Sequence, residues 1–172
     1  MHSTVRENIM EHSEQVAQIA HALAMINNKV FGGNANVDRC VTIAVFHECS
    51  EVITGDLPTP IKYYNSEITG AYKELEAVAN NQLLAMLPED FRLDYANVIS
   101  PDESTIEYKL AKGADKLSAY IKCLEELKSG NKEFQKAEKS IKKELEHSSL
   151  PEVKYFMDNF IAGFKKTLDE LE

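Results

Sequence analysis

Apolar residues recur at every third or fourth position along most of this chain, which is the spacing of one face of an α-helix. No alternation of apolar and polar residues longer than a few positions indicates a β-strand. Glycines and prolines separate the helical segments. The predicted helices are residues 8–27, 37–55, 66–87, 91–99, 104–128 and 132–147, and a last one that begins at Pro151. We therefore expect an all-α fold, in which residues 1–172 form one compact single-domain helical bundle.

Several side chains are expected on the inner faces of these helices. His12 lies one turn before Val16, at the start of a buried stripe, whereas His21 lies off that stripe and is expected at the surface or at the boundary of the core. The inner face of the helix over 66–87 is predicted to carry Ile68, Tyr72, Leu75, Val78, Ala79, Leu83 and Met86. Near the C-terminus, the four-residue spacing of three aromatic residues predicts that they face a core: Phe156, Phe160 and Phe164.

The overall charge and composition exclude some classes of binding partner and indicate the cellular compartment. The net charge of -9 argues against binding to a nucleic acid polymer or to an anionic membrane surface. No apolar run reaches the length of a membrane span, and the first residues do not open a signal peptide. The three cysteines, Cys40, Cys49 and Cys123, lie in apolar helical settings and are expected to be reduced. A cytoplasmic protein is therefore expected. Cys49 is expected to be a packing residue of the core without a chemical role.

One imidazole and two carboxylates follow directly after the apolar run at residues 40–46. Glu51 lies four residues after His47 and three after Glu48, so in a helix all three would gather on neighbouring faces. A buried carboxylate needs a cation or strong hydrogen-bond donors. A divalent metal would satisfy both the imidazole and the acids. The alternative is a histidine and a glutamate that are satisfied within an ordinary core.

Two further helices each contribute one potential ligand, His12 and Asp115. Together with His47 and Glu48 they make a set of two imidazoles and two carboxylates, which suits Mn, Co, Fe or Zn. The absence of ligating thiolates argues against a structural zinc site. Taken singly, His12 could be a satisfied core histidine. Asp115 could instead pair with a lysine of its own helix, for which the candidates are Lys112, Lys116 and Lys122.

The order of these residues resembles the H…HD…D order of the HD-domain metal-dependent phosphohydrolases. Their flanks resemble the bacterial 5′-deoxynucleotidase branch of that superfamily over essentially the whole chain. The stretches that carry this likeness are EHSxQVA at 11–17, FGGN at 31–34, SEVxTGDLPTPxKY at 50–63, ADxxxAYxKCLEEL at 114–127 and YFM at 155–157. The resemblance implies an HD-type helical bundle that forms a cytoplasmic homodimer. It also implies hydrolysis of the 5′-phosphate of deoxynucleoside monophosphates.

The resemblance also implies a role for each residue of the motif. His12, His47, Glu48 and Asp115 would be the ligands of one divalent metal ion, with Co or Mn expected and Fe, Zn or Mg as alternatives. Glu51 matches the catalytic carboxylate that positions or activates the attacking water. Asp56 matches an acidic residue of the substrate-binding site.

Two departures from the family pattern keep other functions open. The family has aspartate where this chain has Glu48, and the extra methylene moves the carboxylate by roughly 1.5 Å. The family also has a further N-terminal helix with an Arg-Trp pair, which is expected to be missing here because the sequence contains no Trp. The alternatives are therefore an HD phosphohydrolase that acts on another phosphate ester, or a non-catalytic protein that binds a nucleotide or a partner.

Overall fold

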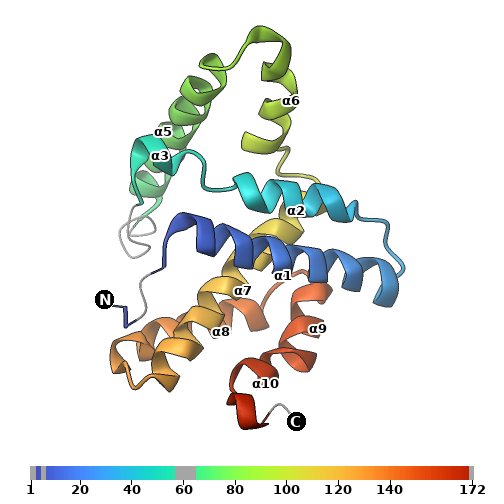
Figure 1. The fold of residues 1–172 in the computed structure, drawn as a ribbon, viewed down its shortest axis with the longest axis vertical. Coiled ribbons are helices and arrows are strands. Elements are labelled where there is room, and N and C mark those ends of the chain that lie inside the picture. The colour runs from blue at the N-terminus through green and yellow to red at the C-terminus, as the bar shows by residue number, and fades with distance from the viewer. Residues whose placement is uncertain (1–2, 5–6, 57–64, 171–172) are drawn as a thin grey trace. The chain divides into compact units, whose positions relative to one another are not determined.

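The computed structural model describes residues 3–4, 7–56 and 65–170, and all regular structure in these ranges is helical (Figure 1). The all-α fold predicted from the apolar spacing is therefore confirmed. The helices in chain order are α1 (Ile9–Val30), α2 (Val37–Phe46), α3 (Glu51–Thr54), α5 (Ser66–Ala85), α6 (Glu89–Ile99), α7 (Ile106–Lys128), η1 (Lys132–Phe134), α8 (Gln135–Glu146), α9 (Pro151–Asn159), α10 (Ile161–Phe164) and η2 (Leu168–Glu170).

The chain divides into two compact units. Unit 1 consists of residues 1–45 and 104–172, and unit 2 consists of residues 46–103. The expectation of one single domain over 1–172 stays a prediction. Within the described residues, no helix combines the length and the apolar character needed to cross a membrane.

The core of unit 1 is built around α7, which contacts α1, α8, α9 and α10 (Figure 1). Four residues of the predicted α7 stripe, Leu110, Ala114, Leu117 and Ile121, are fully buried. Each fully buried leucine or isoleucine contributes roughly 1.5–3 kcal/mol to folding. Gly113 allows close packing on this helix, because a Cβ there would lie 3.0 Å from the side chain of Val153 on α9. The helix ends as predicted, with Gly130 at a φ of 86°.

The first turn of α1 is fixed by a reciprocal pair of hydrogen bonds. The Asn8 side chain accepts hydrogen bonds from the backbone N–H groups of Met10 and Glu11, at 2.9 and 3.1 Å. In return the Glu11 carboxylate accepts from the Asn8 backbone N–H at 3.1 Å. This capping box satisfies donors that the helix itself leaves unpaired, and it sets the start of the helix that carries His12.

Replacing Asn8 by alanine is expected to lower the free energy of unfolding by about 1 kcal/mol. The substitution removes both accepted bonds, whereas Asn8→Ser should retain most of the stability because a serine side chain also caps helices. Urea unfolding of the three proteins would measure the difference. Equal stability of the alanine variant and the parent would contradict this account of the helix start.

Unit 2 consists of α3, α5 and α6, with α5 in contact with both of the others. The predicted inner face of α5 is partly wrong. Tyr72 and Ala79 are its buried residues, while Leu75, Val78 and Met86 are exposed. Within the unit, two short helices cover only part of the circumference of α5, so the rest of its apolar stripe lies at the surface.

The prediction of one continuous helix over 37–55 is wrong, because α2 ends at Phe46 and α3 begins only at Glu51. Between them the hydrogen bonds change from the α-helical pattern to i→i−3. The backbone N–H of Cys49 donates to the carbonyl of Phe46 at 3.1 Å, and that of Glu51 donates to the carbonyl of Glu48 at 3.0 Å. His47 and Glu48 therefore lie on a tight turn rather than on a helix face. The predicted extended connector Leu57-Pro58-Thr59-Pro60 lies outside the described residues.

The aromatic residues near the C-terminus do not all face the core. Phe156 is buried, but Phe160 and Phe164 are exposed, which corrects the prediction of one inward stripe. The reason is that α9 ends at Asn159, so Phe160 lies at the junction with α10 and the four-residue spacing no longer maps onto one helix. The rings still pack together, with centroids 5.2 Å apart for Phe156 and Phe160.

Candidate metal centre

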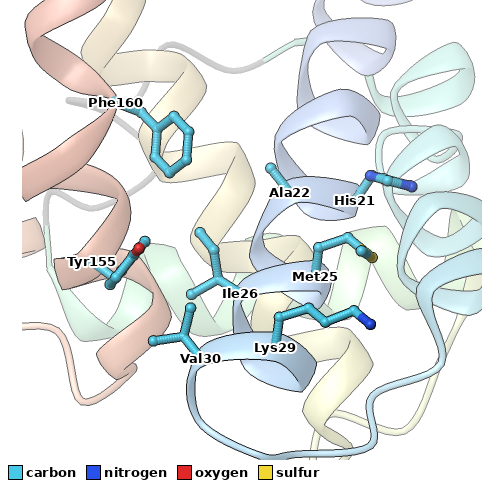
Figure 2. A pocket seen from close by; sticks show the side chains of 8 residues that line it. All are labelled: His21, Ala22, Met25, Ile26, Lys29, Val30, Tyr155 and Phe160. Carbon is cyan, nitrogen blue, oxygen red and sulfur yellow. The ribbon is translucent and has the colours of Figure 1, made fainter.

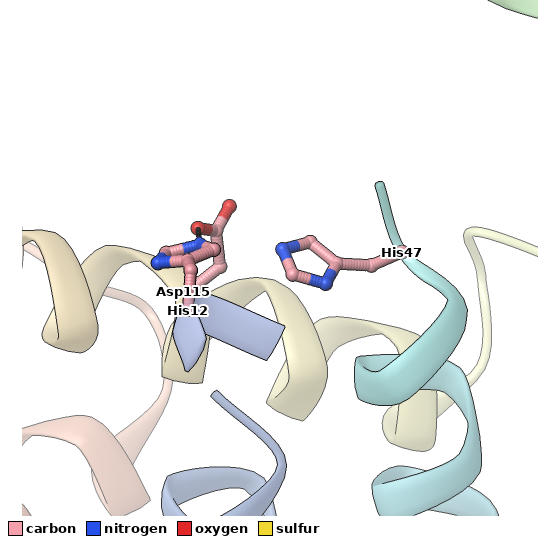
Figure 3. A group of neighbouring side chains, drawn as sticks. All are labelled: His12, His47 and Asp115. Carbon is pink, nitrogen blue, oxygen red and sulfur yellow. Dashed lines mark ion pairs between the residues drawn. The ribbon is translucent and has the colours of Figure 1, made fainter. Parts of the chain in front are cut away.

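His12 on α1 and Asp115 on α7 lie together within unit 1. The His12 Nε2 atom is 3.3 Å from Asp115 Oδ1 (Figure 3). The contact between α1 and α7 brings the two residues together although they lie far apart in the sequence. His12 lies at the edge of the core rather than deep within it, so its ring is directed toward Asp115 and remains partly accessible.

The other ring nitrogen of His12 faces two acceptors. Ser118 Oγ and Glu7 Oε1 each lie 3.4 Å from His12 Nδ1. The Ser118 hydroxyl donates its single proton to Gln15 Oε1 at 2.5 Å. Ser118 can therefore only accept from His12, and Glu7 is also an acceptor. This places a proton on Nδ1, and Nε2 faces Asp115.

This donor set fits a metal ion. With Nδ1 protonated, the lone pair of a neutral His12 lies on Nε2 and faces the Asp115 carboxylate, so either a metal ion or a second proton is needed between them. Two neighbouring ligand atoms bound to one ion at about 2.1 Å lie about 3.0–3.4 Å apart. The observed 3.3 Å agrees with that separation. A proton on Nε2 would satisfy the same pair in the absence of a metal.

The lysines that could have paired with Asp115 are now assigned. Lys112 Nζ lies 3.6 Å from Asp115 Oδ2, one turn away on the same helix. Lys116 instead pairs with Glu144 at 2.7 Å, and Lys122 pairs with Glu7 at 3.3 Å. The Lys112 side chain is half exposed, so water screens its charge. It therefore offsets the negative charge of Asp115 only in part.

The second predicted pair, His47 and Glu48, lies in unit 2 on the turn that follows α2. The His47 side chain is only 6% exposed, and its Nε2 is 3.8 Å from Glu48 Oε1. Figure 3 draws His47 together with His12 and Asp115. Because the two pairs belong to different units, the prediction that all four residues share one ion stays a prediction.

The two residues predicted to act on substrate also belong to unit 2. Glu51 is the first residue of α3 and is partly buried. Asp56 follows the end of α3 and is exposed. Their roles as catalytic and substrate-binding residues stay predictions.

The three cysteines are free, which agrees with their predicted reduced state. Burial raises the pKa of Cys40 to about 12 and that of Cys123 to about 11, and the nearby carboxylates of Glu107, and of Glu138 and Glu126, act in the same direction. Burial also raises the pKa of Cys49, which lies between Glu48 and Ser50. A protonated thiol is a poor metal ligand and a poor nucleophile, so Cys49 has the properties of a packing residue.

A separate apolar groove lies on the surface of unit 1, between α1 and the α9–α10 region (Figure 2). It encloses about 340 Å³, and no carboxylate lines it. His21, predicted to lie at the surface or at the boundary of the core, is exposed at its rim. The lining residues are His21, Ala22, Met25, Ile26, Lys29, Val30, Tyr155 and Phe160. This lining has one imidazole and no carboxylate, so it lacks the mixed ligand set expected for the metal.

Comparison with known proteins decides the family. The family model described as 5′-deoxynucleotidase YfbR-like matches residues 1–164. The chain belongs to the YfbR-like 5′-deoxynucleotidase family. Within this family it is 51% identical over 174 residues to a 5′-deoxynucleotidase of Photobacterium profundum, and 50% identical over 172 residues to one of Vibrio vulnificus. Each of these alignments covers 99% of this chain and 89% of the relative.

A solved structure supports the membership of this YfbR-like chain in the wider HD superfamily. The crystal structure of an HD-domain phosphohydrolase from Listeria innocua matches with a TM-score of 0.82 and 25% sequence identity. The match covers 95% of this chain and 79% of that one. The resemblance drawn from the sequence motifs is therefore confirmed for both the family and the fold.

Sequence reasoning missed the residues around the Nδ1 side of His12. Ser118 lies three positions after Asp115, so helical spacing could have placed it on the same face of α7. Glu7 lies before the cap of α1, in a segment without helical periodicity, and no spacing rule connects it to His12. Its contact arises from the tertiary structure.

Proposed function

We propose that this chain is a metal-dependent 5′-deoxynucleotidase. The reaction converts a deoxynucleoside 5′-monophosphate and water into a deoxynucleoside and inorganic phosphate. The bond between phosphorus and O5′ breaks, a new bond forms from the water oxygen to phosphorus, and the leaving O5′ takes up a proton. The observation that carries this proposal is that curated relatives with about half of their residues identical, over nearly the full chain, are named 5′-deoxynucleotidases.

The proposed metal ligands are His12, His47, Glu48 and Asp115. The His12 and Asp115 pair in unit 1 supports this set because its separation suits two neighbouring ligands. A bound divalent ion would supply positive charge to the phosphoryl oxygens and lower the pKa of water at the site. Mixed imidazole and carboxylate ligands favour Co or Mn, with Fe, Zn and Mg as further candidates.

The remaining roles fall to two carboxylates of unit 2. We assign Glu51 as the general base, because the resemblance matches it to the catalytic carboxylate and a carboxylate can accept a proton from the attacking water. We assign Asp56 to substrate binding. Its exposed carboxylate can accept hydrogen bonds from hydroxyl or amino groups of a nucleotide.

One experiment tests the function against its rivals. The metal content of the purified protein is measured, and phosphate release is then screened across deoxynucleotides, ribonucleotides and simple phosphate esters with Mn, Co, Mg or Zn. Metal-dependent release from deoxynucleoside monophosphates is the expected result. Turnover confined to other esters would favour a different HD phosphohydrolase. Nucleotide binding without release under any metal would favour a non-catalytic protein.

The Glu48→Asp substitution is expected to raise metal affinity or turnover. The family resemblance implies an aspartate here, and a glutamate must fold its longer side chain to reach the same point. An off-rotamer side chain costs on the order of 1 kcal/mol, which corresponds to roughly a fivefold change in affinity. Titration of Co²⁺ into the metal-free parent and variant, followed by assays of dAMP hydrolysis, measures the effect. A variant that gains nothing while neither form hydrolyses any nucleotide would support the binding-only alternative.

We further infer that the protein is a cytoplasmic homodimer. The free cysteines suit a reducing compartment. The apolar groove between α1 and the α9–α10 region offers a surface that a second copy could cover. Light scattering coupled to size exclusion at micromolar concentration should give twice the mass of one chain, 19.4 kDa. A monomer mass under these conditions would refute the dimer.

A further inference from the structure

A row of charged side chains begins at His12 Nδ1, the ring nitrogen that does not face Asp115. Glu7 Oε1 lies 3.4 Å from His12 Nδ1, and its other oxygen, Oε2, lies 3.3 Å from Lys122 Nζ. Lys122 Nζ lies in turn 3.8 Å from Glu126 Oε1, one turn further along α7. All of these residues belong to unit 1, and Lys122 is only 18% exposed. Glu7 thus contacts the imidazole with one oxygen and a partly buried ammonium group with the other.

Glu126, the last residue of this row, is held in place by hydrogen bonds. Glu126 is 1% exposed, and burial of its carboxylate requires strong donors. Its Oε2 accepts hydrogen bonds from the Thr4 backbone N–H at 2.9 Å, the Thr4 hydroxyl at 2.6 Å and the Asn131 amide at 2.8 Å. These contacts fix Glu126 on α7 and attach the segment before α1 to the same helix. Lys122 therefore has one fixed anionic neighbour, and it can hold Glu7 in a defined place.

We propose that Glu7, held by Lys122, is a positioning residue for His12. It accepts the Nδ1–H proton and fixes the rotation of the ring that turns Nε2 toward Asp115. This inference rests on the proposed function, because it requires His12 to be a metal ligand. A carboxylate that accepts the second N–H of a ligating histidine fixes the tautomer and raises the basicity of the ligating nitrogen.

Ser118 alone is not equivalent to Glu7. Both acceptors are 3.4 Å from Nδ1, so they share one proton. The serine hydroxyl is neutral and already donates to Gln15, whereas the glutamate carries a full charge that attracts the N–H group more strongly. Glu7 also comes from outside α7, so it restrains the ring from a second direction.

The test measures Co²⁺ binding to the metal-free 172-residue chain by equilibrium dialysis and by the visible absorption of the bound ion. Glu7→Ala is expected to weaken Co²⁺ binding by about 10–100-fold. Glu7→Gln keeps an acceptor oxygen at the same distance along the side chain and should bind more tightly than Glu7→Ala. The matched control is Glu14→Ala, which removes the same charge from an exposed position on α1 and should leave binding unchanged.

Two outcomes would overturn the proposal. One is equal Co²⁺ affinity of Glu7→Ala and Glu14→Ala. The other is a Co²⁺ affinity of Glu7→Gln that is no higher than that of Glu7→Ala, because even the weaker hydrogen bond accepted by a neutral amide oxygen would then contribute nothing. Circular dichroism of each variant establishes that it is folded, and Glu7→Gln supplies the comparison with Glu14→Ala if the alanine variant does not fold.

His12→Ala separates this inference from the proposed function. If His12→Ala binds Co²⁺ as the parent does, His12 is not a ligand and the proposed ligand set fails together with the role of Glu7. If His12→Ala loses Co²⁺ while Glu7→Ala retains it, the ligand set stands and only the positioning role is wrong.

Discussion

Replacing Glu51 by alanine is expected to reduce phosphate release by roughly 10²–10⁴-fold while metal remains bound, the usual contribution of a positioned general base. The change should appear in kcat, because the carboxylate accepts the proton of the attacking water in the transition state. Glu51 begins α3 and lies three residues after Glu48, so the substitution removes a carboxylate beside the proposed ligands without removing one of them. Single-turnover assays with measured metal occupancy would test this.

The matched control for Glu51→Ala is Glu67→Ala. Glu67 is an exposed carboxylate in the first turn of α5, in the same unit, so its removal causes a similar loss of charge at a helix start. Glu67→Ala should keep full activity. If Glu51→Ala instead loses its metal, Glu51 is a ligand and not the base.

Replacing Asp115 by alanine is expected to abolish both metal binding and hydrolysis. This change removes one of the atoms proposed to contact the ion, so the loss of affinity should exceed the about 10–100-fold typical of residues that only support a ligand. It also leaves His12 Nε2 without its neighbour at 3.3 Å. Metal analysis after dialysis, and the melting temperature with and without Co²⁺, would measure the loss.

Asp158→Ala is the corresponding control for Asp115→Ala. Asp158 on α9 forms an exposed ion pair with Lys154 at 3.7 Å, which resembles the pair between Asp115 and Lys112 at 3.6 Å. The control therefore removes a comparable ion pair away from the proposed site, and it should bind metal as the parent does. Retention of metal by Asp115→Ala would exclude Asp115 from the ligand set.

The sequence was sufficient to predict most of the helices and to single out His12 and Asp115, which lie 3.3 Å apart, but not the path of the chain at His47. Apolar spacing identifies a helix because burial requires one continuous face. No residue in the sequence signals that α2 ends at Phe46, since residues 47–50 include neither glycine nor proline. The first stop signal is Gly55, which adopts a φ of 69° after α3. The motif thus singled out His47 and Glu48 as candidate ligands, while the helix prediction gave them the wrong backbone.

Periodicity was a poor guide where few elements cover a helix. Leu75 and Val78 follow the same spacing as buried Tyr72 and Ala79, yet they are exposed because spacing gives the direction of a side chain and not what covers it. Periodicity also gave no information on Glu7, which lies in no periodic segment but contacts both His12 and Lys122. Contacts of this kind depend on how α1 and α7 pack, and a local pattern does not encode that.

The state of the three cysteines makes the protein a convenient background for thiol-directed labelling. Burial raises the pKa of all three thiols, that of Cys40 to about 12, so the thiolate that reacts with maleimides is scarce at pH 7. Cysteines introduced at exposed positions, such as Gln18 on α1 and Leu93 on α6, should therefore react far faster than the native ones. A pair of fluorophores at these two positions, one in each unit, would report directly whether Co²⁺ or a nucleotide changes the distance between the units.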